Sequence, residues 1–219
     1  KQDLHRGERR QGQMWRRDRI GGILLQASYR KEGSGVEGGF AGVFGQICNG
    51  YFQKHGDQSD ALATIAAKNH KNGCDNPYAQ IRKDLGFEFC RTVSDKNPIV
   101  AGPLKRTDCS LVSDGAAALV MADMDTALGM KKAVAFRARA QVNDYLPLSR
   151  RDMTYLDGCA RAWDQAFTKS GLKLDDLDFV ETHDCFTSAA LMPYAAMGLA
   201  TRGEGSKAAL HGAPEQDDT

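Results

Sequence analysis

The residues best placed to do chemistry in this chain are His183 and Cys185, two positions apart at the end of an apolar segment. Residues 177–180 read as a short strand, and Asp184 is placed to cap a helix that runs toward Pro193. His183 is therefore expected at the carboxyl end of a strand, facing the adjoining crevice. The spacing fits a Cys–His nucleophile pair, and it fits equally a hydrogen-bonded loop histidine beside a small buried cysteine.

A glycine-rich segment offers a second motif. Residues 33–38 have the spacing G-x-G-x-x-G, and Asp57 follows about twenty residues on, a pattern typical of dinucleotide-binding folds. However, charged residues 30–32 separate these glycines from the apolar residues 20–27, and the glycines do not open a convincing helix. A flexible glycine-rich loop is the favoured interpretation, and no cofactor site is predicted.

The cysteines indicate neither a metal site nor a disulfide framework. They form no Cys-x-x-Cys pair, and no histidine is spaced to complete a zinc site; they are Cys48, Cys74, Cys90, Cys109, Cys159 and Cys185. We therefore predict reduced thiols and no metal. The predicted compartment is cytoplasmic, with peroxisomal or mitochondrial placement as the alternatives in a eukaryote.

Charge and length exclude several classes of protein. The chain has 219 residues and a net charge of +1, but residues 1–31 carry nine Lys or Arg against three Asp or Glu. Because this head lacks interleaved aromatic residues, we interpret it as a solvated segment rather than a nucleic-acid-binding arm. No apolar run approaches the roughly 18 residues that span a bilayer, and no secretory signal is recognisable.

Apolar periodicity predicts alternating helices and strands. Residues 61–70 are strong helix formers, and apolar residues of 156–167 recur at helical spacing up to a break at Gly171. Residues 113–121 predict a buried strand or a tightly packed helix, and residues 133–140 predict a further strand. This order favours an α/β layered fold.

Several separated motifs, in this order, resemble those of thiolases, and specifically the sterol-carrier-protein and acetyl-CoA acetyltransferase branch. The resemblance covers about residues 39–200. Its motifs are Lys-Asn-His-Lys-Asn-Gly at 68–73, Asn-Pro-Tyr-Ala-Gln at 76–80, Asp-Cys-Ser with Ser-Asp-Gly-Ala-Ala-Ala within 108–118, and His-Asp-Cys-Phe at 183–186.

The resemblance implies a thiolase-like α-β-α-β-α fold that is incomplete here. Residues 39–123 would form the end of the first thiolase-like half, with its loop region, and residues 124–200 part of the second. Residues 1–38 would be the basic, glycine-rich head and residues 201–219 a tail. Since such a chain leaves sheet edges and apolar faces uncovered, we expect a homo-oligomer or a hetero-complex.

The resemblance also implies an acyl-CoA substrate, a thioester mechanism and no metal. His183 matches the histidine that helps to hold the thioester oxygen, a task in which a positioned donor stabilises developing charge. Ser110 matches a position that contacts the pantetheine arm in some thiolases, or it is a loop serine that satisfies nearby backbone. Asn69 and His70 are expected to hold the loop after their helix.

The rest of the thiolase catalytic set has no match. The chain contains neither a Cys-Ala-Ser-Gly segment nor a Gly-His-Pro motif, and Cys48 and His211 stand in unrelated sequence contexts. His183 is therefore the one catalytic residue predicted. Three interpretations follow: an incomplete form of an acyl-CoA acyltransferase of lipid or sterol side-chain metabolism, a non-catalytic acyl-CoA-binding subunit, or a steroid-CoA side-chain aldolase that works with a partner.

Overall fold

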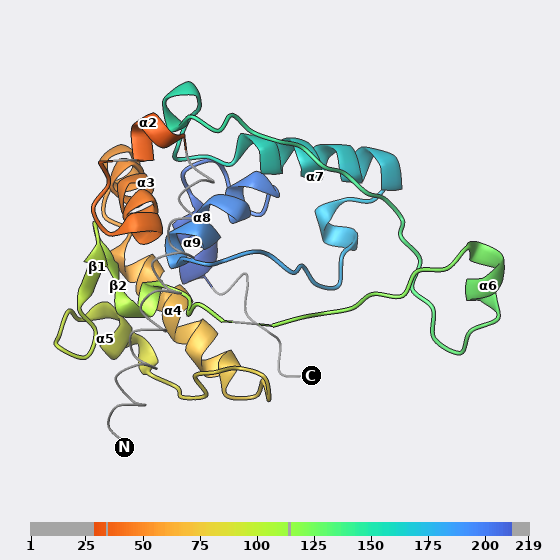
Figure 1. Cartoon of the computed structure of the whole chain (residues 1–219), viewed down its shortest axis with the longest axis horizontal. Helices are drawn as coiled ribbons and strands as arrows, with labels where there is room; N and C mark the ends of the chain where they lie inside the picture. Colours follow the sequence, from red (N-terminus) through yellow and green to blue (C-terminus); the bar gives the residue numbers. More distant parts are fainter. Residues whose placement is uncertain (1–28, 34, 114, 212–219) are drawn as a thin grey trace, which may run out of the picture.

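The computed structural model describes residues 29–33, 35–113 and 115–211. Most of the predicted basic head and the last residues of the predicted tail lie outside these described residues. Helices dominate the described part, and a two-stranded sheet accompanies them (Figure 1). Within that part, no helix is both long enough and apolar enough to cross a membrane.

The core draws its side chains chiefly from α3 (Gly39–His55), α4 (Ser59–Gly73) and α8 (Thr187–Ala196). Nearly every residue of α8 is buried, because the helix carries apolar or small side chains on all of its faces. Leu62 of α4 and Leu191 of α8 are at most 1% exposed. Full burial of such a side chain contributes roughly 1.5–3 kcal/mol to stability. The helix predicted over residues 61–70 is confirmed as α4.

A small hairpin lies against α3. Strands β1 (Ile99–Ala101) and β2 (Leu104–Lys105) pair antiparallel. At Gly45 of α3, an added Cβ would lie 2.8 Å from the carbonyl carbon of Ala101. Only a glycine permits this approach, so Gly45 sets the distance between helix and hairpin.

A buried ion pair ties the hairpin to the start of α8. The 3₁₀ turn η1 (Arg106–Asp108) follows β2, and Lys105 Nζ lies 2.9 Å from Asp108 Oδ2 with both side chains at most 4% exposed. The hydroxyl of Thr187 donates to Asp108 Oδ1 at 2.8 Å. The carboxylate of Asp108 therefore links two segments that are far apart in sequence.

Shorter helices surround the core. α7 packs against α8, α9 packs against α4 and α8, and α5 packs against α4. The helix predicted over residues 156–167 is confirmed as α7, and it ends at Gly171, which has a left-handed φ of 72°. The remaining bounds are α2 Arg30–Gly33, α5 Gly86–Arg91, η2 Leu148–Arg150, α7 Asp157–Ser170, η3 Leu174–Asp176 and α9 Gly205–Leu210.

The glycine-rich segment opens a helix, contrary to the prediction. Gly38 has a φ of 83°, and α3 begins at the next residue. A left-handed glycine lets the chain turn straight into the helix without side-chain strain. The short helix α2, rather than a strand, occupies residues 30–33.

An extended arm, residues 111–147, leaves the helical core and returns to it. Its one described helix, α6 (Met124–Leu128), lies at the tip, far from the other helices (Figure 1). The strand or packed helix predicted for residues 113–121 is wrong, as are the strands predicted for 133–140 and 177–180, because the described residues there form neither. Leu119 is 73% exposed and Val134 96%. The described residues of 113–121 and 133–140 run extended without a neighbouring strand to complete their hydrogen bonds.

Candidate functional site

Phe186 fixes the segment of residues 183–186 to the core. Its ring stacks on Phe44 of α3 with centroids 4.3 Å apart, and Phe40 approaches the same ring at 6.1 Å. Phe186 is only 6% exposed. An aromatic anchor with two ring partners holds the backbone next to it in one position.

Hydrogen bonds hold the same segment on either side of that anchor. The backbone N–H of Ser110 donates to the carbonyl of Cys185 at 2.9 Å, and Cys109 forms an isolated β-bridge with Phe186. The side-chain amide of Asn69 donates to Asp184 Oδ2 at 2.7 Å. The segment is thus fixed at each residue after His183.

The structure corrects two predictions made from the sequence around this segment. Asp184 does not cap α8, because Phe186 occupies the N-cap position and no described side chain caps the helix there. Asn69 reaches across to Asp184, so its side chain supports the His183 segment. His70 lies in the last turn of α4, and its carbonyl accepts a hydrogen bond from Cys74 Sγ at 3.5 Å. Burial lowers the pKa of the His70 imidazole.

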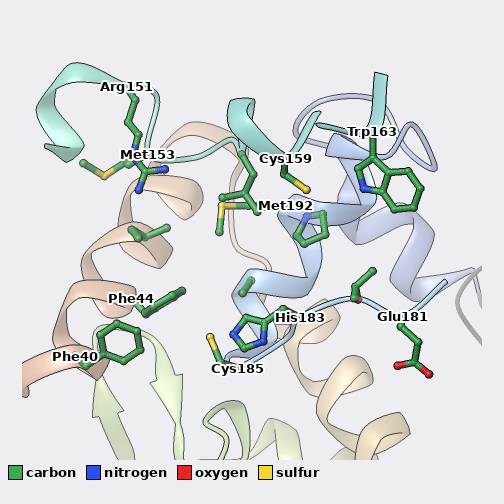
Figure 2. Close-up of a pocket in the computed structure, with 15 residues that line it drawn as sticks. Phe40, Phe44, Arg151, Met153, Cys159, Trp163, Glu181, His183, Cys185 and Met192 are labelled. Carbon is green, nitrogen blue, oxygen red and sulfur yellow. The ribbon is translucent and has the colours of Figure 1, made fainter. Parts of the chain in front are cut away.

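A pocket of about 390 Å³ opens beside this segment (Figure 2). It lies between α3, α7 and α8, and residues 151–156 and 181–185 close its remaining sides. Most of the lining is apolar or aromatic, as in small-molecule sites generally. The lining residues are Phe40, Phe44, Ile47, Arg151, Met153, Leu156, Cys159, Trp163, Glu181, Thr182, His183, Cys185, Ala189, Met192 and Pro193.

His183 is an exposed residue on the rim of this pocket, next to Cys185 (Figure 2). An imidazole in such a place can donate a hydrogen bond to an oxygen that carries negative charge in the transition state. Ser110 is exposed and is not among the lining residues. It touches the site through its backbone, at Cys185.

Burial works against ionisation of the two thiols that line the pocket. Burial, followed by the neighbouring Asp184 carboxylate, raises the pKa of Cys185. Burial also raises the pKa of Cys159, the other cysteine in the lining. Because the thiolate is the reactive form, these shifts favour a small buried cysteine over a Cys–His nucleophile pair.

Other candidate groups lie elsewhere. Cys48 is fully buried in α3, and burial raises its pKa to about 12. His211 borders a separate shallow depression beside α9. Across residues 29–33, 35–113 and 115–211, no group of three His, Cys, Asp or Glu side chains could hold a metal ion. All six cysteines are free thiols.

Sequence reasoning missed most of the pocket. Phe40 and Phe44 are four residues apart on α3, a spacing that places both on one helical face, and this signal was available. Leu156 and Trp163 were predicted to share a helical face, and both line the pocket. Arg151 follows the short 3₁₀ helix η2 in extended conformation, so no helical periodicity indicates it.

Comparisons with known proteins bear on this site. Residues 140–218 match the family described as thiolase C-terminal domain-like. The acetyl-CoA acetyltransferase of Methanothermobacter thermautotrophicus is 31% identical over 171 residues, which are 77% of this chain and 44% of that protein. Bovine sterol carrier protein 2 is 34% identical over 175 residues, 75% of this chain and 31% of the relative. Benzoylsuccinyl-CoA thiolase subunit BbsB of Thauera aromatica is 31% identical over 168 residues, 76% of this chain and 43% of the relative.

The fold agrees with these relatives. The solved structure of the Ltp2–ChsH2(DUF35) aldolase superposes with a TM-score of 0.72 at 22% identity, over 78% of this chain and 46% of that one. This chain spans less than half the length of each protein named here. The predicted resemblance and the incomplete thiolase-like fold are thereby confirmed. Over about three quarters of its length, the chain is similar to thiolases, and residues 140–218 match the thiolase C-terminal domain-like family.

Proposed function

We propose that this chain provides part of an acyl-CoA site of the thiolase type, in which His183 donates a hydrogen bond to the thioester oxygen of the substrate. The observation that carries the proposal is the position of His183 at the rim of an apolar pocket. The His-Asp-Cys-Phe segment that carries it is held by Phe44, Asn69 and Ser110. A preorganised donor beside an apolar acyl pocket is what acyl transfer needs.

In this proposal the reaction is an acyl transfer of the acetyl-CoA acetyltransferase kind, in lipid or sterol side-chain metabolism in the cytoplasm. The names of the relatives support the acyl-CoA class. CoA is a substrate here and not a resident cofactor. The acyl-accepting nucleophile is not supplied by Cys159 or Cys185, because burial raises the pKa of both thiols.

A homo-oligomer or hetero-complex belongs to the same proposal. Apolar side chains of the arm are exposed to solvent, among them Leu119 at 73% and Phe136 at 74%. Leu119, Val120 and Met121 are exposed in succession, and contiguous exposed apolar surface often marks a contact with another protein. Sedimentation of the full chain as a stable, compact monomer would contradict this part of the proposal.

A partner-dependent aldolase is the second candidate. The observation that favours it is the superposition of this chain on the Ltp2–ChsH2(DUF35) aldolase. His183 would then donate to the oxygen of a β-hydroxyacyl thioester during retro-aldol cleavage. Cleavage of such a thioester only after a partner chain is added would support this candidate over acyl transfer.

Activity assays with His183 variants test the main proposal. Where the chain, alone or in a complex that supplies the missing nucleophile, cleaves acetoacetyl-CoA, we expect that cleavage to fall about 10²–10³-fold in His183→Ala, the usual cost of one oxyanion donor. His183→Gln should retain part of the activity because its amide also donates. His211→Ala is the matched control, since His211 lies outside the pocket. Turnover that survives in His183→Ala would refute the role of His183, and acyl-CoA binding without turnover would favour the non-catalytic subunit.

A further inference from the structure

Arg151 is an unusual member of the pocket lining. Of the described residues that line the pocket, it is the one with a Lys or Arg side chain. The side chain is 21% exposed, and its Nε is buried without a hydrogen-bond partner in the part of the chain that the structure describes. A guanidinium has five N–H donors, and burying one of them unsatisfied costs free energy. Arg151 therefore has bonding capacity that its described neighbours leave unused.

The nearby carboxylates do not use that capacity fully. Asp144 Oδ2 lies 3.6 Å from Nη1 of Arg151, which is longer than a hydrogen bond. The Asp144 carboxylate also accepts the backbone N–H groups of Tyr145 at 2.8 Å and Gly158 at 3.4 Å. Asp152 is held by Lys54 at 2.6 Å and by Arg202 at 2.5 Å. Asp144 thus pairs with Arg151 only at long range, and Asp152 is engaged by other cations.

Figure 2 shows where the charge of Arg151 lies relative to His183. In this view Arg151 enters from the upper edge of the pocket, and His183 lies at the lower edge. In this view Met192 lies to the right of Arg151 and Phe44 to the left of His183, and both line the pocket. A ligand that reaches from His183 to Arg151 therefore crosses an apolar region and meets a cation at its far end.

We propose that Arg151 recognises a carboxylate on the acyl chain of the substrate, so that the pocket selects acyl thioesters bearing a second acid group. The proposal rests on the acyl-thioester site at His183 and adds the substrate class. A planar guanidinium pairs with a carboxylate through parallel hydrogen bonds, and an apolar surrounding strengthens the pair. The apolar lining accommodates the methylene chain that joins the carboxylate to the thioester.

A phosphate of CoA is the other anion to consider. A terminal phosphate carries nearly two charges at neutral pH, and burying it against a single guanidinium leaves charge without compensation. A carboxylate carries one charge and matches one guanidinium. Arg151 already faces Asp144 at 3.6 Å, and Glu181 also lines the pocket, so a singly charged carboxylate is easier to accommodate there than a phosphate.

The test compares two thioesters of N-acetylcysteamine, which has no phosphate: the octanoyl thioester and its counterpart with a carboxylate at the end of the chain. Calorimetric titration of the full chain measures both dissociation constants. We expect the carboxylated thioester to bind about tenfold or more tightly, in line with a hydrogen bond to a charged group. Arg151→Met should abolish that preference, and Arg151→Lys should keep part of it. Arg150→Met is the control, since Arg150 stacks over Tyr145 outside the pocket and should leave the preference intact.

Several outcomes would overturn the inference. Equal binding of the two thioesters to the wild-type chain would overturn it without any variant. The proposal can therefore be refuted even if Arg151→Met does not fold. An unchanged preference for the carboxylated thioester in Arg151→Met would also refute it. A loss of affinity in that variant for free CoA alone would refute it too, because it would mean that Arg151 binds a phosphate. These results leave the role of His183 standing, because that role is judged by turnover. Failure of both thioesters to bind would count against both proposals.

Discussion

The helical core and the extended arm of residues 111–147 are both rich in apolar side chains, yet only the core buries them. Leu62 in α4 is fully buried. In the arm, Leu119 is 73% exposed and Val134 is 96% exposed. Composition alone therefore does not decide which part of this chain packs.

The difference comes from where backbone hydrogen bonds are made. A helix closes its N–H and C=O groups within its own segment, so α3, α4 and α8 can form first and then pack. A strand needs a neighbour, and the described arm residues have none beside them. The core helices therefore satisfy their own backbone hydrogen bonds. The described extended residues of the arm have no partner strand, and unpaired strand edges tend to pair with another chain segment.

The largest effect should come from the boundary between the two regions, at Asp108. Asp108→Ala leaves the buried Lys105 without its partner, and it removes the hydrogen bond from Thr187. We expect the free energy of unfolding to fall by about 3–5 kcal/mol. Urea denaturation measures this loss. Replacing both partners, as Lys105→Met with Asp108→Leu, should recover much of the lost stability. A loss below about 1 kcal/mol in Asp108→Ala would contradict the predicted role of the pair.

A cavity in the core should have the next largest effect. Leu62→Ala removes a fully buried side chain from the cluster shared by α3, α4 and α8. We expect a loss of about 3 kcal/mol in the free energy of unfolding, because the packed helices cannot collapse into the space. The same denaturation experiment measures it. A loss below about 1 kcal/mol would show that the core is as loosely packed as the arm.

The fold could be predicted from sequence wherever the determining interactions are local. The residues of α4 and α7 carry helical periodicity, and Gly171 ends α7 as predicted. Residues 133–140 and 177–180 have apolar character that suits a strand, but that pattern does not reveal whether a partner strand is present. The strand predictions were wrong for this reason.

Of the residues at the site, only His183 at its chemical centre could be predicted from the sequence. His183 stood out because a motif carries it, and the fold places it at a pocket rim. The supporting contact from Asn69 to Asp184 spans 115 positions, so no local pattern could indicate it. Arg151 was missed for a similar reason, since its importance depends on burial beside three helices.

Acid should weaken the contacts that hold the segment after the arm, at Asp152, to the core. Burial alone would raise the pKa of Asp152, but hydrogen bonds from Lys54, Thr154 and Arg202 outweigh it and hold that pKa well below its usual range. The unfolded chain therefore takes up this proton first as the pH falls. The stability from Asp152 is complete above about pH 5 and declines toward the depressed folded pKa.

Melting temperatures across this acid range measure the effect of Asp152. We expect the wild-type chain to lose thermal stability more steeply below about pH 4 than Asp152→Asn, which has no carboxylate to protonate at this position. Asp125→Asn is a suitable control because Asp125 is an exposed residue of α6 at the tip of the arm, away from the core. Parallel acid curves for the wild-type chain and Asp152→Asn would show that this ion-pair cluster contributes nothing to stability.

The smallest effect should come from the arm itself, and it is the sharpest test of the comparison. Val134→Ser replaces an apolar side chain that is 96% exposed, so almost no buried area is lost. We expect the free energy of unfolding to change by less than about 0.5 kcal/mol, against about 3 kcal/mol for Leu62→Ala. Urea denaturation at several protein concentrations distinguishes the two origins of any larger loss. A loss above about 1 kcal/mol that does not depend on concentration would mean that the arm packs within its own chain, whereas a concentration-dependent loss would mean that Val134 contacts a second copy.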